Sequence, residues 1–323
     1  MARACEVDAL LLKDESRRFE LMSFKALGGA YAVELLARER GGGDGLTVTC
    51  ATDGNHGRAV AWGARRVGAK AVIFVHETVS QGRIDAIAGF GAEVVVVPGT
   101  YDDAVRHAAV VAEQEGWQIV SDTSWPGYAD LPRHVMQGYA VLAAEILEAE
   151  PQPTHVFVPG GVGGLAAGVL SWLWELKGPE RPVFVVVEPD QAACLFLSAE
   201  RGEPTTFPGE LDTIMAGLAC GEPSMLAWRL LGPGTDAFMT ITDDAVAQMM
   251  RNLAEERIVS GESGATAIAG FHHAASDPAM REALCIGPHA RVVCLSTEGA
   301  TDPEIYRNIV GRDAADVARG KPA

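Results

Sequence analysis

Short apolar segments alternate with helical segments through the first half of the chain. Residues 46–51, 71–75 and 92–97 are apolar almost throughout, which is typical of strands buried on both faces. Residues 58–67 and 80–90, which lie between them, repeat their apolar positions at helical spacing. Because continuous apolar strands alternate with helices, the pattern predicts an open parallel sheet covered by helices on both faces.

The same alternation returns in the second half. The apolar segment 154–158 is followed by a glycine-rich loop and then by a helical segment at residues 165–176. Residues 182–187 and 291–295 have the composition of further central strands. The sequence therefore predicts an α/β protein with two open, mostly parallel sheets covered by helices.

The chain has room for two compact domains, since it contains 323 residues. The clearest linker is the stretch EAEPQP at residues 148–153. We expect a smaller domain at residues 46–142, and a larger domain built from residues 1–45 and 143–323.

The charge of the chain limits its partners. A net charge of −17 leaves no basic stripe to neutralise phosphates, so nucleic-acid binding is not expected. Arg3, Glu6 and Asp8 interrupt the N-terminus, which lacks the apolar core of a signal peptide. The most apolar helical stretch, at residues 165–174, is too short to span a bilayer. We therefore expect a cytoplasmic protein that binds no membrane.

Cysteine and histidine positions predict no metal site. The six cysteines have no CxxC spacing, and the eight histidines have no HExxH spacing. We expect the cysteines to be reduced in the cell. Cys194 and Cys220 both lie in segments flanked by glycine, proline or aspartate and could meet in space.

Lys25 is a candidate for covalent chemistry. It follows Ser23 and Phe24 and precedes a segment with helical periodicity at residues 26–36. The positive end of a helix dipole favours the neutral form of a lysine amine, and Schiff-base formation requires a neutral amine. A solvated surface lysine is the alternative interpretation.

A glycine-rich loop follows a predicted strand and opens a predicted helix. It consists of Gly160, Gly161, Val162, Gly163 and Gly164. Backbone N–H groups in such a loop can approach a phosphate without obstruction by Cβ atoms, and the helix dipole favours the anion. The loop is neither a Walker loop nor a good dinucleotide fingerprint. A tight turn without a ligand is the alternative.

A polar turn at residues 52–57 supplies the third candidate element. Asn55 could donate a hydrogen bond to a phenolate oxygen, and the amides of residues 54–57 could receive a carboxylate. Asp53 is a candidate proton carrier, because an acid beside a carboxylate-binding turn would otherwise repel the substrate; a turn-forming or capping aspartate is the alternative. His56 either binds substrate or packs and caps. The predicted substrate-binding residues are Thr52, Asp53, Gly54 and His56.

Together, an amine, a phosphate-sized loop and a polar turn suit an enzyme that holds pyridoxal 5′-phosphate (PLP) as a Schiff base. The order of several motifs also resembles a known family. These motifs are SFKALGGAY, ATDGNHGRAVAW, GAEVVVVP, DTSWPGY, MQGY, GGVGG, VVEPD, TIMAGLACGEPS, ESGA and LSTEGATD. They resemble the fold type II PLP enzymes (tryptophan synthase β-like) and, among these, the diaminopropionate ammonia-lyases, over residues 13–308.

The resemblance implies roles for individual residues. It implies that Lys25 is the Schiff-base lysine, that Asn55 contacts the phenolic oxygen and that residues 160–164 cradle the phosphate. Ser296 is implied as the partner of the pyridine nitrogen, with Thr297 as the alternative by one place. The resemblance also implies a larger domain that binds the cofactor, a smaller domain on the substrate side, an active site in the cleft between them and a homodimer.

Two acids distinguish this branch. Related dehydratases carry serine where Asp53 stands, and Asp122 in DTSWPGY is similar to a second acid of the ammonia-lyases. Both could attract a β-ammonium group of a small amino-acid substrate. The implied reaction is the PLP-dependent α,β-elimination of 2,3-diaminopropionate to pyruvate and two ammonia. Lys25 takes the Cα proton from one face or Asp53 from the other, so Lys25, Asp53 and Asp122 are the predicted catalytic residues.

Three alternatives remain at this point. The first is another PLP eliminase that acts on serine, threonine or 3-hydroxyaspartate, and the second is a non-catalytic amino-acid-binding homologue. A β-substituting synthase is the third. The chain also departs from the family, because family members have a longer N-terminal segment that bears an early strand. A Gly41-Gly42-Gly43 run replaces a longer connection between Lys25 and Asp53.

Overall fold

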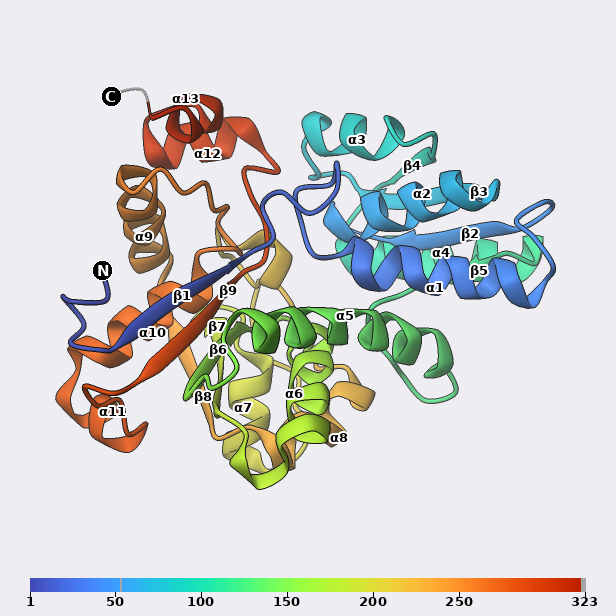
Figure 1. The fold of residues 1–323 in the computed structure, drawn as a ribbon. Helices are drawn as coiled ribbons and strands as arrows, with labels where there is room; N and C mark the ends of the chain where they lie inside the picture. The colour runs from blue at the N-terminus through green and yellow to red at the C-terminus, as the bar shows by residue number, and fades with distance from the viewer. Residues whose placement is uncertain (53, 321–323) are drawn as a thin grey trace. The chain divides into compact units, whose positions relative to one another are not determined.

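The computed structural model describes residues 1–52 and 54–320. The chain divides into two compact units. The larger unit comprises Met1–Arg17 and Tyr139–Ala323, and the smaller unit comprises Arg18–Gly138. Each unit contains one parallel sheet flanked by helices, which confirms the predicted fold class (Figure 1).

The smaller unit contains a four-stranded sheet with the order β4-β3-β2-β5. Its strands are β2 (Thr47–Ala51), β3 (Lys70–His76), β4 (Glu93–Val97) and β5 (Gln118–Ile119), all parallel. Its helices are α1 (Ala26–Glu39), α2 (Asn55–Val67), α3 (Gln81–Ala88) and α4 (Tyr101–Glu115). The helices α2 and α4 pack against β2 and β3, which explains why residues 71–75 are buried.

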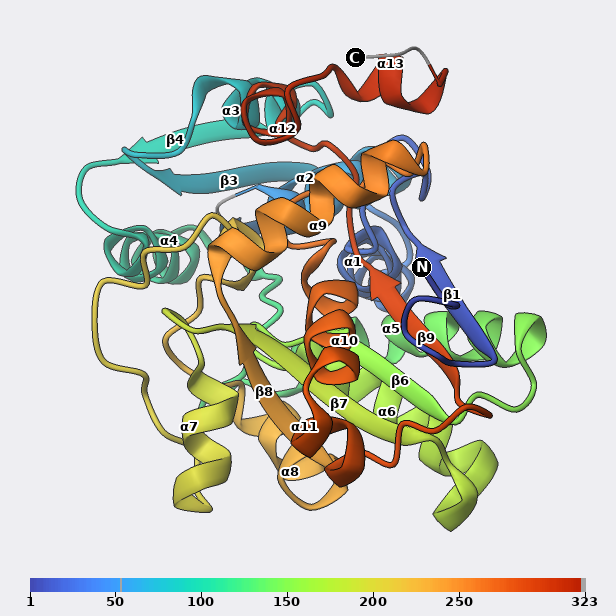
Figure 2. The ribbon, with the colours of Figure 1, turned by 90° about the vertical axis from the view of Figure 1, so that its left-hand side faces the viewer.

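The larger unit contains a five-stranded parallel sheet with the order β1-β9-β6-β7-β8 (Figure 2). Its strands are β1 (Ala9–Asp14), β6 (His155–Pro159), β7 (Val183–Pro189), β8 (Ala237–Ile241) and β9 (Arg291–Ser296). Its main helices are α6 (Gly164–Lys177), α7 (Cys194–Arg201), α8 (Met225–Gly234), α9 (Asp243–Glu255) and α10 (Thr266–Ser276). Three short helices follow, namely α11 (Pro278–Ala283), α12 (Pro303–Val310) and α13 (Ala314–Ala318), while α5 (Asp130–Ala149) carries the chain between the units.

Each sheet has a point at which the direction of strand addition reverses. In the smaller unit β3 and β4 are added on one side of β2 and β5 on the other. In the larger unit β7 and β8 are added on one side of β6 and β9 on the other. Ligands of open α/β sheets bind beyond the carboxyl ends of the strands at such points. A ligand is therefore expected beyond the carboxyl ends of β2 and β5, or of β6 and β9.

The division into units differs from the predicted one at two places: residues 18–45 were expected in the larger domain, and residues 139–142 in the smaller one. Small residues let α1 pack closely on α2. A Cβ atom on Gly63 would lie 2.7 Å from the Cα atom of Ala30, and one on Gly29 would lie 3.1 Å from the Cβ atom of Ala59. This close approach places α1 in the smaller unit.

The described part of the chain contains neither a membrane-spanning helix nor a cluster of metal-binding side chains. Over residues 1–52 and 54–320, no helix combines the length and the apolar character that crossing a membrane requires. The same part of the chain holds no group of three or more His, Cys, Asp or Glu side chains arranged for a metal ion.

Candidate active site

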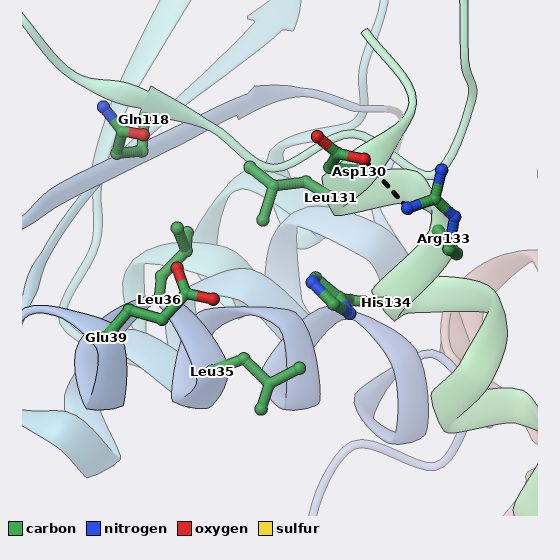
Figure 3. A pocket seen from close by; sticks show the side chains of 8 residues that line it. All are labelled: Leu35, Leu36, Glu39, Gln118, Asp130, Leu131, Arg133 and His134. Carbon is green, nitrogen blue, oxygen red and sulfur yellow. Dashed lines mark hydrogen bonds and ion pairs between the residues drawn. The ribbon is translucent and has the colours of Figure 1, made fainter.

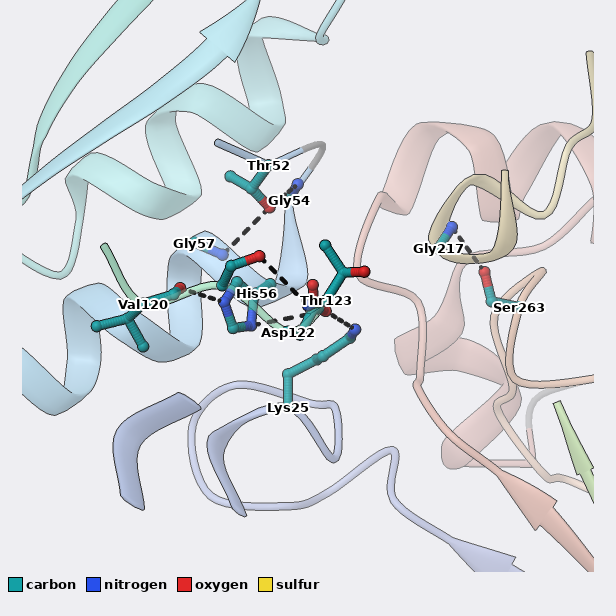
Figure 4. A network of polar contacts seen from close by, with 11 residues as sticks. Lys25, Thr52, Gly54, His56, Gly57, Val120, Asp122, Thr123, Gly217 and Ser263 are labelled. Carbon is teal, nitrogen blue, oxygen red and sulfur yellow. Dashed lines mark hydrogen bonds and ion pairs between the residues drawn. The ribbon is translucent and has the colours of Figure 1, made fainter. Parts of the chain in front are cut away.

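Lys25 and Asp122 form an ion pair within the smaller unit (Figure 4). Lys25 directly precedes α1, as its predicted position at a helix start required. Asp122 lies just beyond the carboxyl end of β5. The Lys25 Nζ donates to Asp122 Oδ2 at 2.6 Å, and the two side chains are only 17% and 18% exposed. The structure therefore brings these two predicted catalytic residues together.

The ion pair determines the charge of both groups. Burial would raise the pKa of the Asp122 carboxyl, but the positive charges of Lys25 and of a protonated His56 outweigh it and hold that pKa well below its usual range. Asp122 is therefore ionised at neutral pH. A carboxylate at 2.6 Å stabilises the ammonium form of Lys25. This effect opposes that of the helix dipole, which favours the neutral amine and was the basis of the prediction.

His56 completes this group from the first turn of α2 (Figure 4). Its Nε2 lies 2.7 Å from the carbonyl oxygen of Val120 and donates to it, because a carbonyl only accepts. Its Nδ1 lies 3.8 Å from Asp122 Oδ2 and has no hydrogen-bond partner among residues 1–52 and 54–320. The ring is buried, and burial followed by the Lys25 charge lowers the pKa of His56 against the opposing effect of Asp122. The predicted substrate-binding role of His56 stays a prediction.

The polar turn after β2 is held by Thr52. Its Oγ1 accepts hydrogen bonds from the backbone N–H groups of Gly54 at 3.0 Å and Gly57 at 3.2 Å. A Cβ atom on Gly57 would lie 2.4 Å from Thr52 Cγ2, so only glycine fits there. Asn55 begins α2, and its Oδ1 accepts from Arg58 Nη1 at 3.4 Å. Asp53 lies outside the described residues, so its catalytic and substrate-binding roles stay predictions.

In the larger unit, the glycine loop connects β6 to α6 as the sequence predicted. Gly161 and Gly163 have φ angles of 64° and 95°, in the left-handed region that favours glycine. A Cβ atom on Gly160 would lie 2.5 Å from Glu188 Cγ. No side chain caps the first turn of α6, so its backbone N–H groups and helix dipole suit an anion such as a phosphate.

Ser296 is the last residue of β9, so it lies beside the glycine loop's strand in the same sheet. Its side chain is fully buried, and its Oγ is 2.8 Å from Ser260 Oγ. Thr297, the alternative by one place, is also buried. A pair of neutral hydroxyl groups suits a pyridine nitrogen that carries no proton. A carboxylate at this position would instead stabilise the protonated nitrogen. The donor types in this unit therefore fit PLP.

Glu188 is a site residue that the sequence interpretation missed. It lies near the end of β7 and accepts hydrogen bonds from the backbone N–H groups of Leu195 at 3.0 Å and Phe196 at 2.7 Å. Burial raises the pKa of Glu188 to about 8 against the effect of these two bonds. An acid inside the apolar run VFVVVEP was the available signal.

Two cysteines also lie beside the glycine loop. The Cys194 thiol donates to the carbonyl oxygen of Gly161 at 3.6 Å, and a Cβ atom on Gly161 would lie 3.8 Å from Cys220 Sγ. The segments that carry Cys194 and Cys220 therefore meet at this loop, as the sequence suggested they could. None of the six cysteines, all of which lie in the described part of the chain, forms a disulfide bond.

A separate pocket of about 370 Å³ lies near the end of α1 (Figure 3). Leu36 and Glu39 line it together with Asp130 and Arg133, which pair with each other at 2.9 Å. Leu36 is eleven residues along the chain from Lys25, about 16 Å at 1.5 Å per helical residue. None of the predicted site residues lines this pocket, so it is distinct from the Lys25 group.

Comparison with known proteins agrees with this geometry. The family model described as "Pyridoxal-phosphate dependent enzyme" matches residues 1–298. The chain is 40% identical to the diaminopropionate ammonia-lyase of Escherichia coli (strain K12), over 96% of this chain and 85% of that protein. It is 34% identical to the biosynthetic L-threonine dehydratase of the same strain, over 82% of this chain and 49% of that protein.

Solved structures give the same grouping. The holo form of the diaminopropionate ammonia-lyase from Escherichia coli superposes with a TM-score of 0.90 at 40% identity, covering 96% of this chain and 84% of that one. The complex of that enzyme with an aminoacrylate-PLP azomethine reaction intermediate superposes with a TM-score of 0.88 at 40% identity, with the same coverage of both chains. The chain therefore belongs to the pyridoxal-phosphate dependent enzyme family and, within it, to the group of the diaminopropionate ammonia-lyases.

Proposed function

We propose that this protein catalyses the PLP-dependent α,β-elimination of ammonia from 2,3-diaminopropionate, which yields pyruvate and a second ammonia. The observation that carries the proposal is the Lys25–Asp122 ion pair at 2.6 Å, since it combines the reactive amine with an ionised acid. Relatives that are 40% identical to this chain are named diaminopropionate ammonia-lyases. PLP is the cofactor, and when bound it stabilises the negative charge that develops at the substrate Cα atom.

The residues of the two units have separate tasks toward this cofactor. Lys25 supplies the amine that binds its aldehyde, and Asn55 contacts its phenolic oxygen. The backbone N–H groups of residues 160–164 bind its phosphate, which the open left-handed conformations of Gly161 and Gly163 support. Ser296 contacts the pyridine nitrogen through its hydroxyl group.

Asp122 favours a substrate with a second ammonium group. Its carboxylate is ionised because positive neighbours keep the Asp122 pKa below its usual range. An anion beside the reactive lysine attracts the β-ammonium of diaminopropionate, whereas the hydroxyl group of serine or threonine offers no charge to it. Lys25 takes the Cα proton from one face of the substrate, or Asp53 takes it from the other.

The competing function is a dehydratase for serine or threonine. The similarity to the L-threonine dehydratases, at 34% identity over 82% of this chain, is the observation that favours it. Asp122 beside Lys25 argues against it, because an ionised carboxylate has no electrostatic attraction for a neutral hydroxyl leaving group.

Product stoichiometry distinguishes the two functions. The full-length protein with PLP is given 2,3-diaminopropionate, serine or threonine, and coupled assays measure the keto acid and ammonia. We expect diaminopropionate to be turned over at least about 100-fold faster, from about 3 kcal/mol of charge recognition, with two ammonia per pyruvate. Faster turnover of serine or threonine with one ammonia per keto acid would establish the dehydratase instead.

The assembly is a smaller part of the proposal. A homodimer follows from the family, and light scattering on the full-length protein measures the mass in solution. A mass of about 34 kDa, that of the single chain, would contradict it.

A further inference from the structure

The buried imidazole of His56 has one nitrogen that the proposed reaction does not yet use. Nε2 donates to Val120, so the neutral ring carries its proton there and Nδ1 has a free lone pair. The ring is 6% exposed, and a buried polar atom without a partner is destabilising. The polar atom beside Nδ1 is Asp122 Oδ2, at 3.8 Å.

The same carboxylate oxygen contacts Lys25. Asp122 Oδ2 accepts from Lys25 Nζ at 2.6 Å and lies 3.8 Å from His56 Nδ1 (Figure 4). One oxygen therefore lies between a nitrogen with a proton to release and a nitrogen with a lone pair to receive it. A modest rotation of the Asp122 carboxylate brings the second distance to about 2.8 Å, the usual length of a charge-assisted hydrogen bond.

We propose that His56 is the proton acceptor that converts Lys25 from an ammonium into a neutral amine, with Asp122 as the bridge between them. This rests on the proposed function, in which Lys25 must be neutral to bind the aldehyde of PLP. An N–H bond breaks at Lys25 Nζ, the proton passes through Asp122 Oδ2, and an N–H bond forms at His56 Nδ1. The net charge of the three groups is unchanged, and the transfer needs no other reactant.

Electrostatic repulsion disfavours a state in which Lys25 and His56 are both positively charged. The charge of Lys25 disfavours a protonated His56, whereas the charge of Asp122 favours it. When Lys25 becomes neutral, the first effect disappears and the second remains, so Asp122 pairs with an imidazolium in place of an ammonium. His56 is thus a positioning residue that controls the charge of Lys25 and itself contacts no substrate in this role.

Two other titratable groups among the described residues interact with Asp122, and neither competes for the proton. Cys50, in β2, and Tyr128 both interact with Asp122. Burial raises the pKa of each well above its ordinary value, so both stay protonated and neutral at pH 7. The Tyr128 hydroxyl is also already bonded to the backbone of Ile119 and Ser121.

The first test measures the charge of His56 directly. The full-length protein and its Lys25→Met variant are labelled with ¹⁵N-histidine, and the His56 signal is assigned by its absence from His56→Gln. In the parent protein without added PLP, we expect His56 to be neutral with its proton on Nε2 at pH 7. In Lys25→Met its titration midpoint should rise by about one pH unit, because a neighbouring positive charge is removed. Equal midpoints in the two proteins would overturn the proposal.

The second test measures the amine. His56→Gln keeps an N–H group for the Val120 carbonyl but cannot hold a proton. We expect its condensation with PLP at pH 7, followed by the visible absorption band, to be about tenfold slower and to recover near pH 9. His134→Gln is the matched control, since His134 lies in the same unit and pairs with Gln137. Circular dichroism confirms folding.

The two tests separate the relay from the proposed function. If the parent protein forms the absorption band and His56→Gln follows the same pH profile, the relay is wrong and the function stands. If neither protein forms the band, the PLP role of Lys25 fails, and the His56 titration in Lys25→Met still decides whether the two groups are coupled.

Discussion

The smaller and larger units each bury a carboxyl group beside their candidate site residues, and the two groups differ in charge. Asp122 has the Lys25 ammonium group as a neighbour, and the His56 ring adds a positive charge when it is protonated, so the Asp122 pKa falls well below the usual range. Within the described residues, the hydrogen-bond partners of Glu188 are backbone N–H donors and a thiol, and burial raises its pKa to about 8. The comparison shows that burial alone does not set the charge of an acid; a cation within contact distance does.

The difference matches the tasks of the two sets of residues. The smaller unit contributes titratable side chains that can move protons, namely Lys25 and Asp122, which are partly exposed, and His56, which is buried. The larger unit contributes backbone N–H groups and neutral hydroxyls, which in the proposed function would bind an anion and a ring without proton transfer. Substitutions should therefore affect the reaction in the one unit and cofactor affinity in the other.

The largest effect is expected for Lys25→Met, which removes the reactive amine and keeps a side chain of similar length. Pyruvate formation from diaminopropionate should fall at least about 10³-fold, because no other group supplies this covalent step. Lys70→Met is the control, since Lys70 is an exposed lysine paired with Glu93 in the same unit. Retention of more than a few per cent of the activity would show that the reactive amine lies elsewhere.

Gly160→Ala tests the shape of the phosphate loop. The new Cβ atom would lie 2.5 Å from Glu188 Cγ, and such overpacking costs about 1–3 kcal/mol. We expect PLP to bind about 10- to 100-fold more weakly in a fluorescence titration, with the Lys25 reaction intact at saturating PLP. Gly287→Ala is the control, because nothing lies within 4 Å of its added Cβ atom. Equal affinities in both variants would mean that the loop does not bind the phosphate.

Glu188→Gln tests whether the pKa of Glu188 is raised, in contrast to the lowered pKa of Asp122. The pKa of Glu188 rises from 4.5 to about 8 on folding, so its contribution to stability is complete below pH 4.5 and is lost as the pH rises through 8. Asp122, whose pKa falls, contributes in the opposite sense, above pH 3.8, and loses its contribution on acidification.

Between pH 5 and pH 8 the parent protein should therefore lose about 2–4 kcal/mol of unfolding free energy that Glu188→Gln does not lose. Urea unfolding at several pH values measures this, with the exposed Glu203→Gln as control. Parallel pH profiles for parent and Glu188→Gln would show that Glu188 is ionised in the folded protein.

Ser296→Ala should have the smallest effect. It removes one partner of the buried Ser260 hydroxyl, which costs about 1 kcal/mol of stability. PLP affinity should fall about fivefold through the lost contact with the pyridine nitrogen. Ser276→Ala, at an exposed hydroxyl, is the control. If Thr297→Ala lowers the affinity and Ser296→Ala does not, the contact belongs one residue further along.

Local patterns were sufficient for six of the nine strands in the described part of the chain, all but β1, β5 and β8, and for two of the site elements. The predicted strand at residues 71–75 is the buried centre of β3, and the helix after Lys25 begins at Ala26. The glycine loop connects β6 to α6 because strand, loop and helix are contiguous in sequence. Such features depend on neighbouring residues, which a sequence displays directly.

Features that depend on distant residues were not predictable. β1 pairs with β9, and their paired residues Ala9 and Arg291 are far apart in the chain. The direction of the His56 ring depends on the Val120 carbonyl, and the charge of Lys25 depends on Asp122, 97 positions away. Glu188 acquires its surroundings from the start of α7 and from Gly160. No local periodicity encodes these contacts.

The central claim is that Lys25 is the residue that binds PLP, and trapping tests it most directly. The full-length protein is mixed with PLP and reduced with borohydride, and mass spectrometry locates the modified lysine. The candidates are Lys13, Lys25, Lys70, Lys177 and Lys321. We expect stoichiometric modification of Lys25. We also expect 2,3-diaminopropionate to prevent this modification when it is added before reduction. Modification of another lysine, or no modification that exceeds the level at exposed Lys70, would contradict it.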